Sequence, residues 1–327
     1  MRPNRRSLFS WLGAIVLFGL LATLPLFLND FLMTIAVVIG INVIIVFGLS
    51  LLMGYAGQIS LGHAGLYGLG AYASAIMSMR LHLNPWLTII LGALLAGAAA
   101  YLIGLPALRL RGHYLAMATL GAGVILQILF VELSGLTGGP AGVSSIPNLK
   151  IGRLVLDQTG SYFYVVLAAV ALTLWLSLNV VRSQKGRVLR AMHGNELAAA
   201  CIGVDIARTK LFIFTLSGVF AGLAGGLYAH YLTYISPDSF GTSLSILLVA
   251  MVVIGGSQSV VAAGLGAALL TVISEYFRTY QDWSLVFFGL SLVLVMIFAP
   301  RGLFVEAAVL AKRLYAKVVS RRAAATG

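Results

Sequence analysis

Residues 31–53 read FLMTIAVVIGINVIIVFGLSLLM, an apolar run that contains no charged residue. A helix needs about 17–25 predominantly apolar residues to cross about 30 Å of hydrocarbon, and it satisfies its backbone hydrogen bonds internally. Similar runs recur along the 327 residues, which are 60% hydrophobic and only 9% charged. A soluble domain carries about 25% charged residues. The sequence therefore predicts an all-α, polytopic membrane protein with a single transmembrane domain over residues 1–327.

The apolar runs predict about ten transmembrane or re-entrant helices. The first follows the basic start MRPNRR, and we interpret it as a retained helix rather than a signal peptide, because no clear small-residue cleavage site follows it. The third, eighth and ninth are short or interrupted by glycine, which makes them candidates for half-helices. The ten segments cover residues 8–28, 31–53, 59–79, 86–108, 113–134, 162–181, 211–232, 242–256, 260–277 and 283–299.

The basic residues predict the orientation of these helices. An even number of crossings places both termini on one side, and Lys and Arg are enriched on the cytoplasmic side of membrane proteins. With a cytoplasmic N-terminus, 17 of the 21 Lys and Arg residues fall in inner segments, and the outer ones are Arg80, Lys150, Arg153 and Arg278. We therefore expect cytoplasmic N- and C-termini. The net charge of +12 is explained by this topology, so no nucleic-acid partner is expected.

Three segments lie between or beyond the predicted helices. Residues 135–161 are rich in Gly, Pro and Ser, and they are predicted to form a periplasmic loop. Residues 182–210 are basic and helix-prone and are predicted to lie in the cytoplasm, and residues 300–327 are predicted to form a basic cytoplasmic tail. The single cysteine, Cys201, falls in the cytoplasmic segment, where thiols stay reduced. A small filler residue is the favoured interpretation of this cysteine.

Residues 54–76 read GYAGQISLGHAGLYGLGAYASAI, a glycine-broken segment at the predicted depth of the membrane. Its glycines allow close helix packing, which is one interpretation. Its polar residues favour another, because irregular backbone in a membrane is tolerated only where protein buries it or where it lines a watery cavity. The candidate residues for a translocation path here are Gln58, Ser60, Gly62, His63 and Gly65.

A second glycine break occurs in residues 252–273, which read VVIGGSQSVVAAGLGAALLTVI. Each break follows a segment that is predicted to run from outside to inside. Paired glycine-interrupted segments are typical of transporters built from internal repeats. We therefore add Gly255, Gly256 and Ser257 to the candidate translocation path.

The cytoplasmic segment contains two helix-prone stretches, GRVLRAMHG (186–194) and NELAAACIG (195–203). Asn195 is placed to cap the second helix. A short helix held between two spans can dock in a groove of a cytoplasmic partner. The alternative is a solvated basic loop at the lipid headgroups, which attract such charges.

Motifs for catalysis are absent from the sequence. It contains no G-x-x-x-x-G-K-[ST] loop, no H-E-x-x-H and no G-x-S-x-G, and its five histidines lack metal-ligand spacing. The nine acidic residues fall in loops or near the ends of predicted helices, which argues against a proton-driven carrier. The chain is therefore predicted to be a transport protein and not an enzyme, with no cofactor or metal of its own.

Five stretches resemble, in order, the LivM-type permeases of branched-chain amino-acid ABC importers. They are GQISLGHAGLYGLGAYASA (57–75), RLRGHYLAMATLG (109–121), GLTGGPAGV (135–143), GRVLRAMHGNELAAACIGVDIARTKLFIFTLSGVFAGLAGGLYA (186–229) and APRGLF (299–304). The resemblance implies a permease subunit of an ATP-driven importer for Leu, Ile or Val in the bacterial cytoplasmic (inner) membrane.

The same resemblance implies a set of partners. They are a homologous second permease subunit, two cytoplasmic ABC ATPase subunits that hold ATP and Mg, a periplasmic substrate-binding protein, and membrane lipid. Residues 186–203 become the expected coupling region. This chain departs from the family at His193 and Gly194, where relatives often carry a charged pair. The implied coupling residues are Gly186, Arg187, Arg190, Glu196, Ala199 and Gly203.

Several alternatives stay open at this point. Related systems carry urea, short amides or other amino acids, so the resemblance does not identify the substrate. A path poor in charge suits a net-neutral substrate with an apolar side chain. A stand-alone carrier or channel would transport without ATP, and an assembly or scaffold protein would leave transport intact when it is deleted.

Overall fold

The computed structural model describes residues 19, 21–23, 25, 28–151, 154–155, 159–277, 289 and 302–307. Most of the predicted spans 8–28 and 283–299 and most of the predicted tail 300–327 lie outside the described residues. The elements in chain order are α2 (Asp30–Ser50), the π-helical turn η2 (Leu51–Tyr55), α3 (His63–Arg80), α4 (Pro85–Ala107), α5 (His113–Glu132), α6 (Ser134–Thr137), η3 (Gly139–Ala141), β1 (Val143–Ser144), β2 (Lys150–Ile151), β3 (Leu154–Val155), α7 (Thr159–Arg182), α8 (Gln184–Gly194), α9 (Glu196–Cys201), α10 (Ile206–Leu232), β4 (Tyr234–Ile235), η4 (Pro237–Phe240), α11 (Thr242–Gly255) and α12 (Val260–Phe277).

The described part of the chain is mostly helical, as expected. Six of its helical segments are long and apolar enough to cross a membrane. The count of ten helices and the orientation of the termini stay predictions. The six segments cover residues 30–55, 85–107, 113–132, 159–182, 206–232 and 237–255.

Two predicted boundaries were wrong. The helix expected from residue 59 begins only at His63, because the chain leaves the helical conformation after Tyr55 and Gly57 adopts a positive φ of 67°. The helix expected from residue 211 begins at Ile206. Its N-cap is Asp205, whose side chain accepts a hydrogen bond from the amide of Arg208, and this capping extends the helix into polar sequence.

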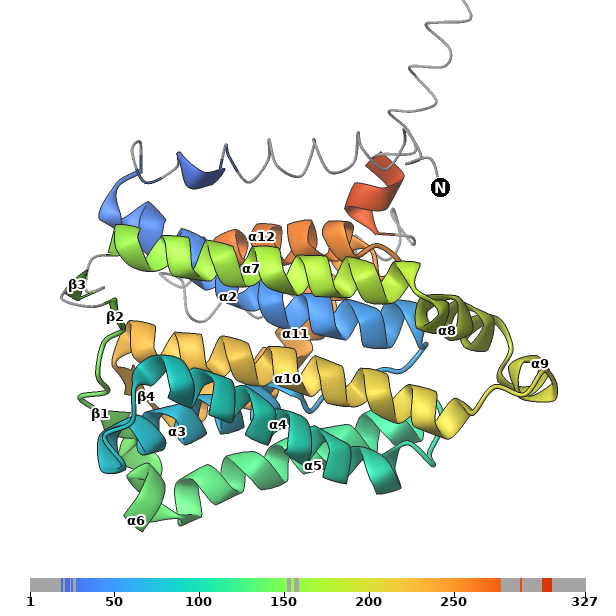
Figure 1. Ribbon diagram of the computed structural model, residues 1–327, viewed down its shortest axis with the longest axis horizontal. Coiled ribbons are helices and arrows are strands. Elements are labelled where there is room, and N and C mark those ends of the chain that lie inside the picture. The colour runs from blue at the N-terminus through green and yellow to red at the C-terminus, as the bar shows by residue number, and fades with distance from the viewer. Residues whose placement is uncertain are drawn as a thin grey trace, which may run out of the picture.

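The long helices lie side by side, with α2 near the middle (Figure 1). On one side α2 packs against α7 and α12, and on the other it packs against α10, which also contacts α3 and α4. The helices α8 and α9 lie at one end of the bundle, and the short strands lie at the other (Figure 1). At the strand end β1 pairs with β4 in antiparallel register, which joins the predicted periplasmic loop to the segment after α10.

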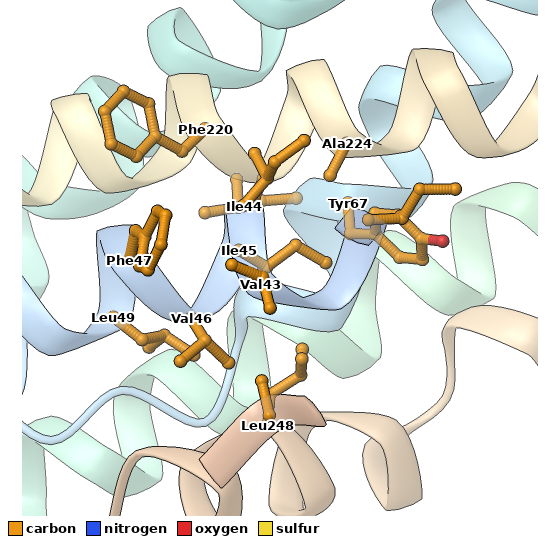
Figure 2. Packing of buried hydrophobic residues seen from close by; sticks show 14 of the residues in the cluster. Val43, Ile44, Ile45, Val46, Phe47, Leu49, Tyr67, Phe220, Ala224 and Leu248 are labelled. Atoms are coloured by element: carbon orange, nitrogen blue, oxygen red, sulfur yellow. The ribbon is translucent and has the colours of Figure 1, made fainter. Parts of the chain in front are cut away.

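The core is built from apolar side chains of α2, α10 and α11. Figure 2 shows Ile44 and Phe47 of α2 facing Phe220 of α10, with Leu248 of α11 on another side of α2. All four side chains are buried. Between lipid-exposed helices, dense packing rather than exclusion of water holds such contacts together.

Glycines let α3 and α10 approach at backbone distance. A Cβ at Gly225 of α10 would overlap the carbonyl oxygen of Tyr67 on α3, and a Cβ at Gly70 would overlap the backbone of Gly222. Small residues at helix interfaces allow this closeness in membranes. The α3–α10 interface positions the polar clusters described next.

Candidate translocation path and coupling segment

The two predicted glycine breaks meet in the structure. A Cβ at Gly54 would overlap the carbonyl oxygen of Ser257, and the Oγ of Ser50 donates a hydrogen bond to the same oxygen at 3.1 Å. Gly256 adopts a φ of 117°, a value that side chains rarely permit, and Gly302 lies against its backbone. The structure therefore brings together two candidate segments that are about 200 residues apart in sequence.

The first break is also held against α5. A Cβ at Gly62 would overlap the carbonyl oxygen of Thr119, and a Cβ at Gly65 would lie 3.0 Å from the Cα of Gly123. These two predicted path residues therefore lie at a close backbone contact between helices. Their geometry accounts for the glycines by packing alone.

His63 lies at the centre of a buried polar cluster. Its Nδ1 is 2.9 Å from the Oγ of Ser60, and its Nε2 is 2.7 Å from the Oγ of Ser217 on α10. The ring also makes an edge contact with Phe214. All three polar residues are buried, so the cluster satisfies its own hydrogen bonds away from water.

The start of α3 is capped by hydroxyl groups from other helices. The amide of Leu61 donates to the Oγ1 of Thr119 on α5, and the amide of Ala64 donates to the Oγ of Ser245 on α11, each at 3.1 Å. The first amides of a helix have no partner within the helix, so Ser245 supplies one for Ala64, while Thr119 holds the residue before the N-cap Gly62. Sequence analysis missed Thr119, Ser217 and Ser245, because a lone hydroxyl in an apolar helix carries little signal.

Gln58 lies in the same glycine-broken segment, is buried and has unmet hydrogen-bonding capacity. Its side chain is 2% exposed, and neither its Oε1 nor its Nε2 has a hydrogen-bond partner among the residues that the structure describes. A buried amide without partners costs about 1–3 kcal/mol for each unmet group. Such a group is a candidate to bind a polar ligand or to gain partners in another conformation.

A second buried histidine links the same two helices at the strand end. The Nδ1 of His230 on α10 donates to the carbonyl oxygen of Pro147 at 2.7 Å, and its Nε2 is 2.9 Å from the Oγ of Ser74 on α3. The Oγ1 of Thr88 on α4 lies 3.4 Å from the same Nε2. This cluster ties the predicted periplasmic loop to three helices, and sequence analysis did not select it.

The predicted coupling segment (residues 186–203) comprises most of α8 and all of α9, and the inner face of α8 packs on the bundle. Gly186, Leu189 and Met192 are buried at helical spacing, while Arg187 and Arg190 are exposed. A Cβ at Gly186 would overlap the carbonyl oxygen of Val181, so glycine permits the sharp turn from α7. Of the predicted coupling residues in α8, only the two arginines therefore face outward.

The helix α9 follows, and its predicted cap is confirmed. The Oδ1 of Asn195 accepts hydrogen bonds from the amides of Leu197 and Ala198 at 3.0 and 3.1 Å. Ala199 is buried, whereas Leu197 and Ile202 are 69% and 76% exposed.

Two other predicted coupling residues lie at the two ends of this helix. Gly203 ends α9 with a φ of 84°. Glu196 forms an ion pair with Lys210 at the start of α10. The side chains of α9 that face outward are therefore mostly apolar, and the carboxylate of Glu196 has a partner within the chain.

The coupling segment touches the first break directly. A Cβ at Gly57 would lie 2.9 Å from the Nδ1 of His193. His193 is one of the two positions at which this chain departs from the pattern of the family. The positive φ of Gly57 favours glycine there as well. One residue of α8 therefore rests against the backbone that leads to Gln58, Ser60 and His63.

No metal-binding constellation is found in the described parts of the chain, where no three His, Cys, Asp or Glu side chains converge. The site instead offers hydroxyl, imidazole and amide groups. Such groups can form hydrogen bonds to a neutral or zwitterionic solute.

The chain is similar to permeases of known transport systems. The branched-chain amino-acid permease LivM of Escherichia coli K12 is 36% identical over 258 residues, which are 72% of this chain and 61% of that protein. A probable LivM of Methanocaldococcus jannaschii is 22% identical over 76% of this chain and 78% of its own length. The ribose import permease RbsC of Escherichia coli K12 is 26% identical over 68% of this chain and 67% of its own length. No solved structure matches the chain.

The family comparison covers the two breaks and the coupling segment together. The model described as branched-chain amino acid transport system / permease component matches residues 31–298. This range spans α2 to α12, and so contains both histidine clusters and the helices α8 and α9. The chain therefore belongs to the family of permease components of branched-chain amino-acid transport systems.

Proposed function

We propose that the chain is the permease subunit of an ATP-driven importer that moves branched-chain amino acids across the bacterial inner membrane. A periplasmic binding protein delivers the substrate, a homologous second permease completes the pore, and two cytoplasmic ATPases hold ATP and Mg. The observation that carries this proposal is the contact of α8 with the glycine break, because it connects the segment that is predicted to be cytoplasmic to buried polar groups.

The proposed mechanism starts at the exposed face of α9. Leu197 and Ile202 offer apolar side chains to a groove on the ATPase, and the exposed Arg187 and Arg190 on α8 flank them. When the ATPases close, α8 and α9 move, and His193 transmits the displacement to Gly57. The break then shifts relative to α5 and α12, which opens the path on one side and closes it on the other.

The buried amide and hydroxyl groups suit transient binding of a zwitterionic amino acid. Gln58 provides a donor and an acceptor that lack partners among the described residues, and Ser60 lies two residues beyond it. Apolar surroundings suit the substrate side chain. Low affinity is sufficient in the pore, because the binding protein supplies the selectivity.

A second candidate is an importer for another neutral solute, such as urea, a short amide or a sugar. The similarity to a ribose permease supports it, because related chains serve different solutes. Both candidates share the architecture and differ in the binding protein. Binding assays on the partner binding protein with leucine, urea and ribose would separate them.

Reconstitution of the whole complex tests the proposal. The tagged chain is purified in mild detergent, its partners are identified by mass spectrometry, and the complex is placed in liposomes with loaded binding protein. We expect uptake of labelled leucine that requires ATP inside the liposomes. Uptake by this chain alone without ATP would instead support a stand-alone carrier.

Cysteine accessibility tests the path assignment. In a Cys201→Ser background, which removes the single native thiol, we expect Gln58→Cys and Ser60→Cys to react with small water-soluble reagents during turnover. Ala224→Cys, fully buried in the α10 core, is the matched control and should stay unreactive. Equal protection of all three positions during turnover would remove Gln58 and Ser60 from the path.

A further inference from the structure

We propose that Glu196 acts inside the chain as a positioning residue that clamps the coupling helix α9 to α10 and to the turn between α4 and α5. This inference rests on the proposed coupling of the chain to ATPases. It assigns Glu196 a role different from direct contact with the ATPase, which is the role that its place in the sequence suggested. The clamp consists of Glu196, Lys210 and Arg111.

The geometry of the clamp engages both oxygens of the carboxylate. Oε1 of Glu196 is 2.6 Å from the Nζ of Lys210, and Oε2 is 3.8 Å from the Nε of Arg111. The Lys210 side chain is only 6% exposed, whereas that of Arg111 is 73% exposed. The ion pair of Glu196 with Lys210 is therefore the one shielded from solvent, and the pair with Arg111 lies on the solvent side.

Burial makes Lys210 depend on Glu196. An ammonium group taken out of water requires a counter-charge, and removal of one partner from a buried pair is strongly destabilising. The exposed pair with Arg111 contributes much less, because water and salt screen it. Glu196 also occupies the first turn of α9, where a negative charge is favoured by the helix dipole.

The clamp connects the exposed apolar face of α9, which we propose docks on the ATPase, to the polar cluster around His63. Ala199 is buried against the bundle on the same helix as Glu196, while Leu197 and Ile202 stay exposed. Lys210 and Ser217 are seven residues apart on α10, which corresponds to about 10 Å along a helix. Movement of α9 would therefore reach α10 close to the hydrogen bond between Ser217 and His63.

A double-mutant cycle on the reconstituted complex tests the clamp. The variants are Glu196→Gln, Lys210→Met and the double substitution, and the readout is substrate imported per ATP hydrolysed. We expect Glu196→Gln to lower this ratio about tenfold. The same substitution should have little effect in the Lys210→Met background, because no buried charge is left unpaired.

The control for this cycle is Arg208→Ala, two residues from Lys210. Arg208 is 90% exposed and pairs with Asp205 at the surface, so its loss should leave the ratio unchanged. If Glu196→Gln has the same effect with and without Lys210, the carboxylate acts on another molecule and the clamp is overturned. Failure of the wild-type complex to import with ATP would instead refute the proposed function.

A labelling experiment needs no substitution and covers the case in which the variants do not assemble. The full-length chain in detergent, without ATPases, is treated with an amine-reactive reagent and analysed by mass spectrometry. We expect Lys210 to react at least about tenfold more slowly than the exposed Lys150. Equal reaction rates would overturn the clamp.

Discussion

Two buried histidines join α3 and α10 in opposite directions. His63 belongs to α3 and reaches Ser217 on α10, whereas His230 belongs to α10 and reaches Ser74 on α3. The first lies at the glycine break and the second lies under the predicted periplasmic loop. One helix interface therefore carries two clusters of similar chemistry at different depths.

The clusters differ in how firmly their hydrogen bonds are fixed. Nδ1 of His230 faces the carbonyl oxygen of Pro147, which can only accept, so Nδ1 is a donor, and in the neutral ring Nε2 is then an acceptor. Both ring nitrogens of His63 face hydroxyl groups, which donate or accept equally well. The difference indicates that the hydrogen bonds of His230 are fixed, whereas those of His63 can rearrange.

The largest expected effect comes from separating the two helices, which would break both clusters. Gly225→Val places a side chain against the backbone of Tyr67, where no flexible group can yield. We expect a loss of about 3 kcal/mol or more in stability, measured as a lower Tm and lower yield in detergent. Gly121→Val on α5 is the control, because nothing lies within 4 Å of its Cβ position. Equal Tm values for the two variants would contradict the close α3–α10 packing.

Removal of the His230 side chain should have the second-largest effect on stability. His230→Ala leaves Ser74 and the carbonyl oxygen of Pro147 without their partner in a buried site. We expect a destabilisation of about 2–3 kcal/mol, with import falling only in proportion to the folded protein. Thermal unfolding and import per folded molecule are both measured, with the exposed His113→Ala as control. A loss of import per folded molecule would make this cluster part of the transport cycle.

His63→Ala should show the opposite balance. The hydroxyls of Ser60 and Ser217 can each rotate and can act as donor or acceptor, so we expect a smaller destabilisation of about 1–2 kcal/mol. Import per folded molecule should fall by more than it does in His230→Ala. If both variants lose import equally once corrected for folding, the distinction between the two clusters is wrong.

The smallest effect on stability is expected for Thr88 in the His230 cluster. Thr88 lies 3.4 Å from His230, the longest contact in that cluster. Thr88→Val keeps the shape of the side chain and should cost about 1 kcal/mol in unfolding free energy, with normal import. A destabilisation as large as that of His230→Ala would contradict this ranking and would point to the hydrogen bonds of Thr88 with Ser74 and with the carbonyl oxygen of Pro85, each at 3.0 Å.

Structural features that depend on residues close together in the sequence were predicted correctly. The apolar run of residues 31–53 and the cap at Asn195 were predicted because each depends on residues within one or a few turns. The partners of His63 and Glu196 were not predicted. Ser217 is 154 residues from His63, and Lys210 and Arg111 resemble any other basic residues beside a membrane span.

A helical membrane protein of the branched-chain amino-acid permease family could be predicted from the sequence, because hydrophobic length and ordered motifs are properties of the chain alone. The glycine segments that break the helices could be predicted as well. The meeting of the two breaks at Ser257, the contact of His193 with Gly57 and the pairing of Glu196 with a buried lysine are visible only in the folded chain. These contacts join residues distant in sequence, and packing in three dimensions selects them among many equivalent small or polar residues.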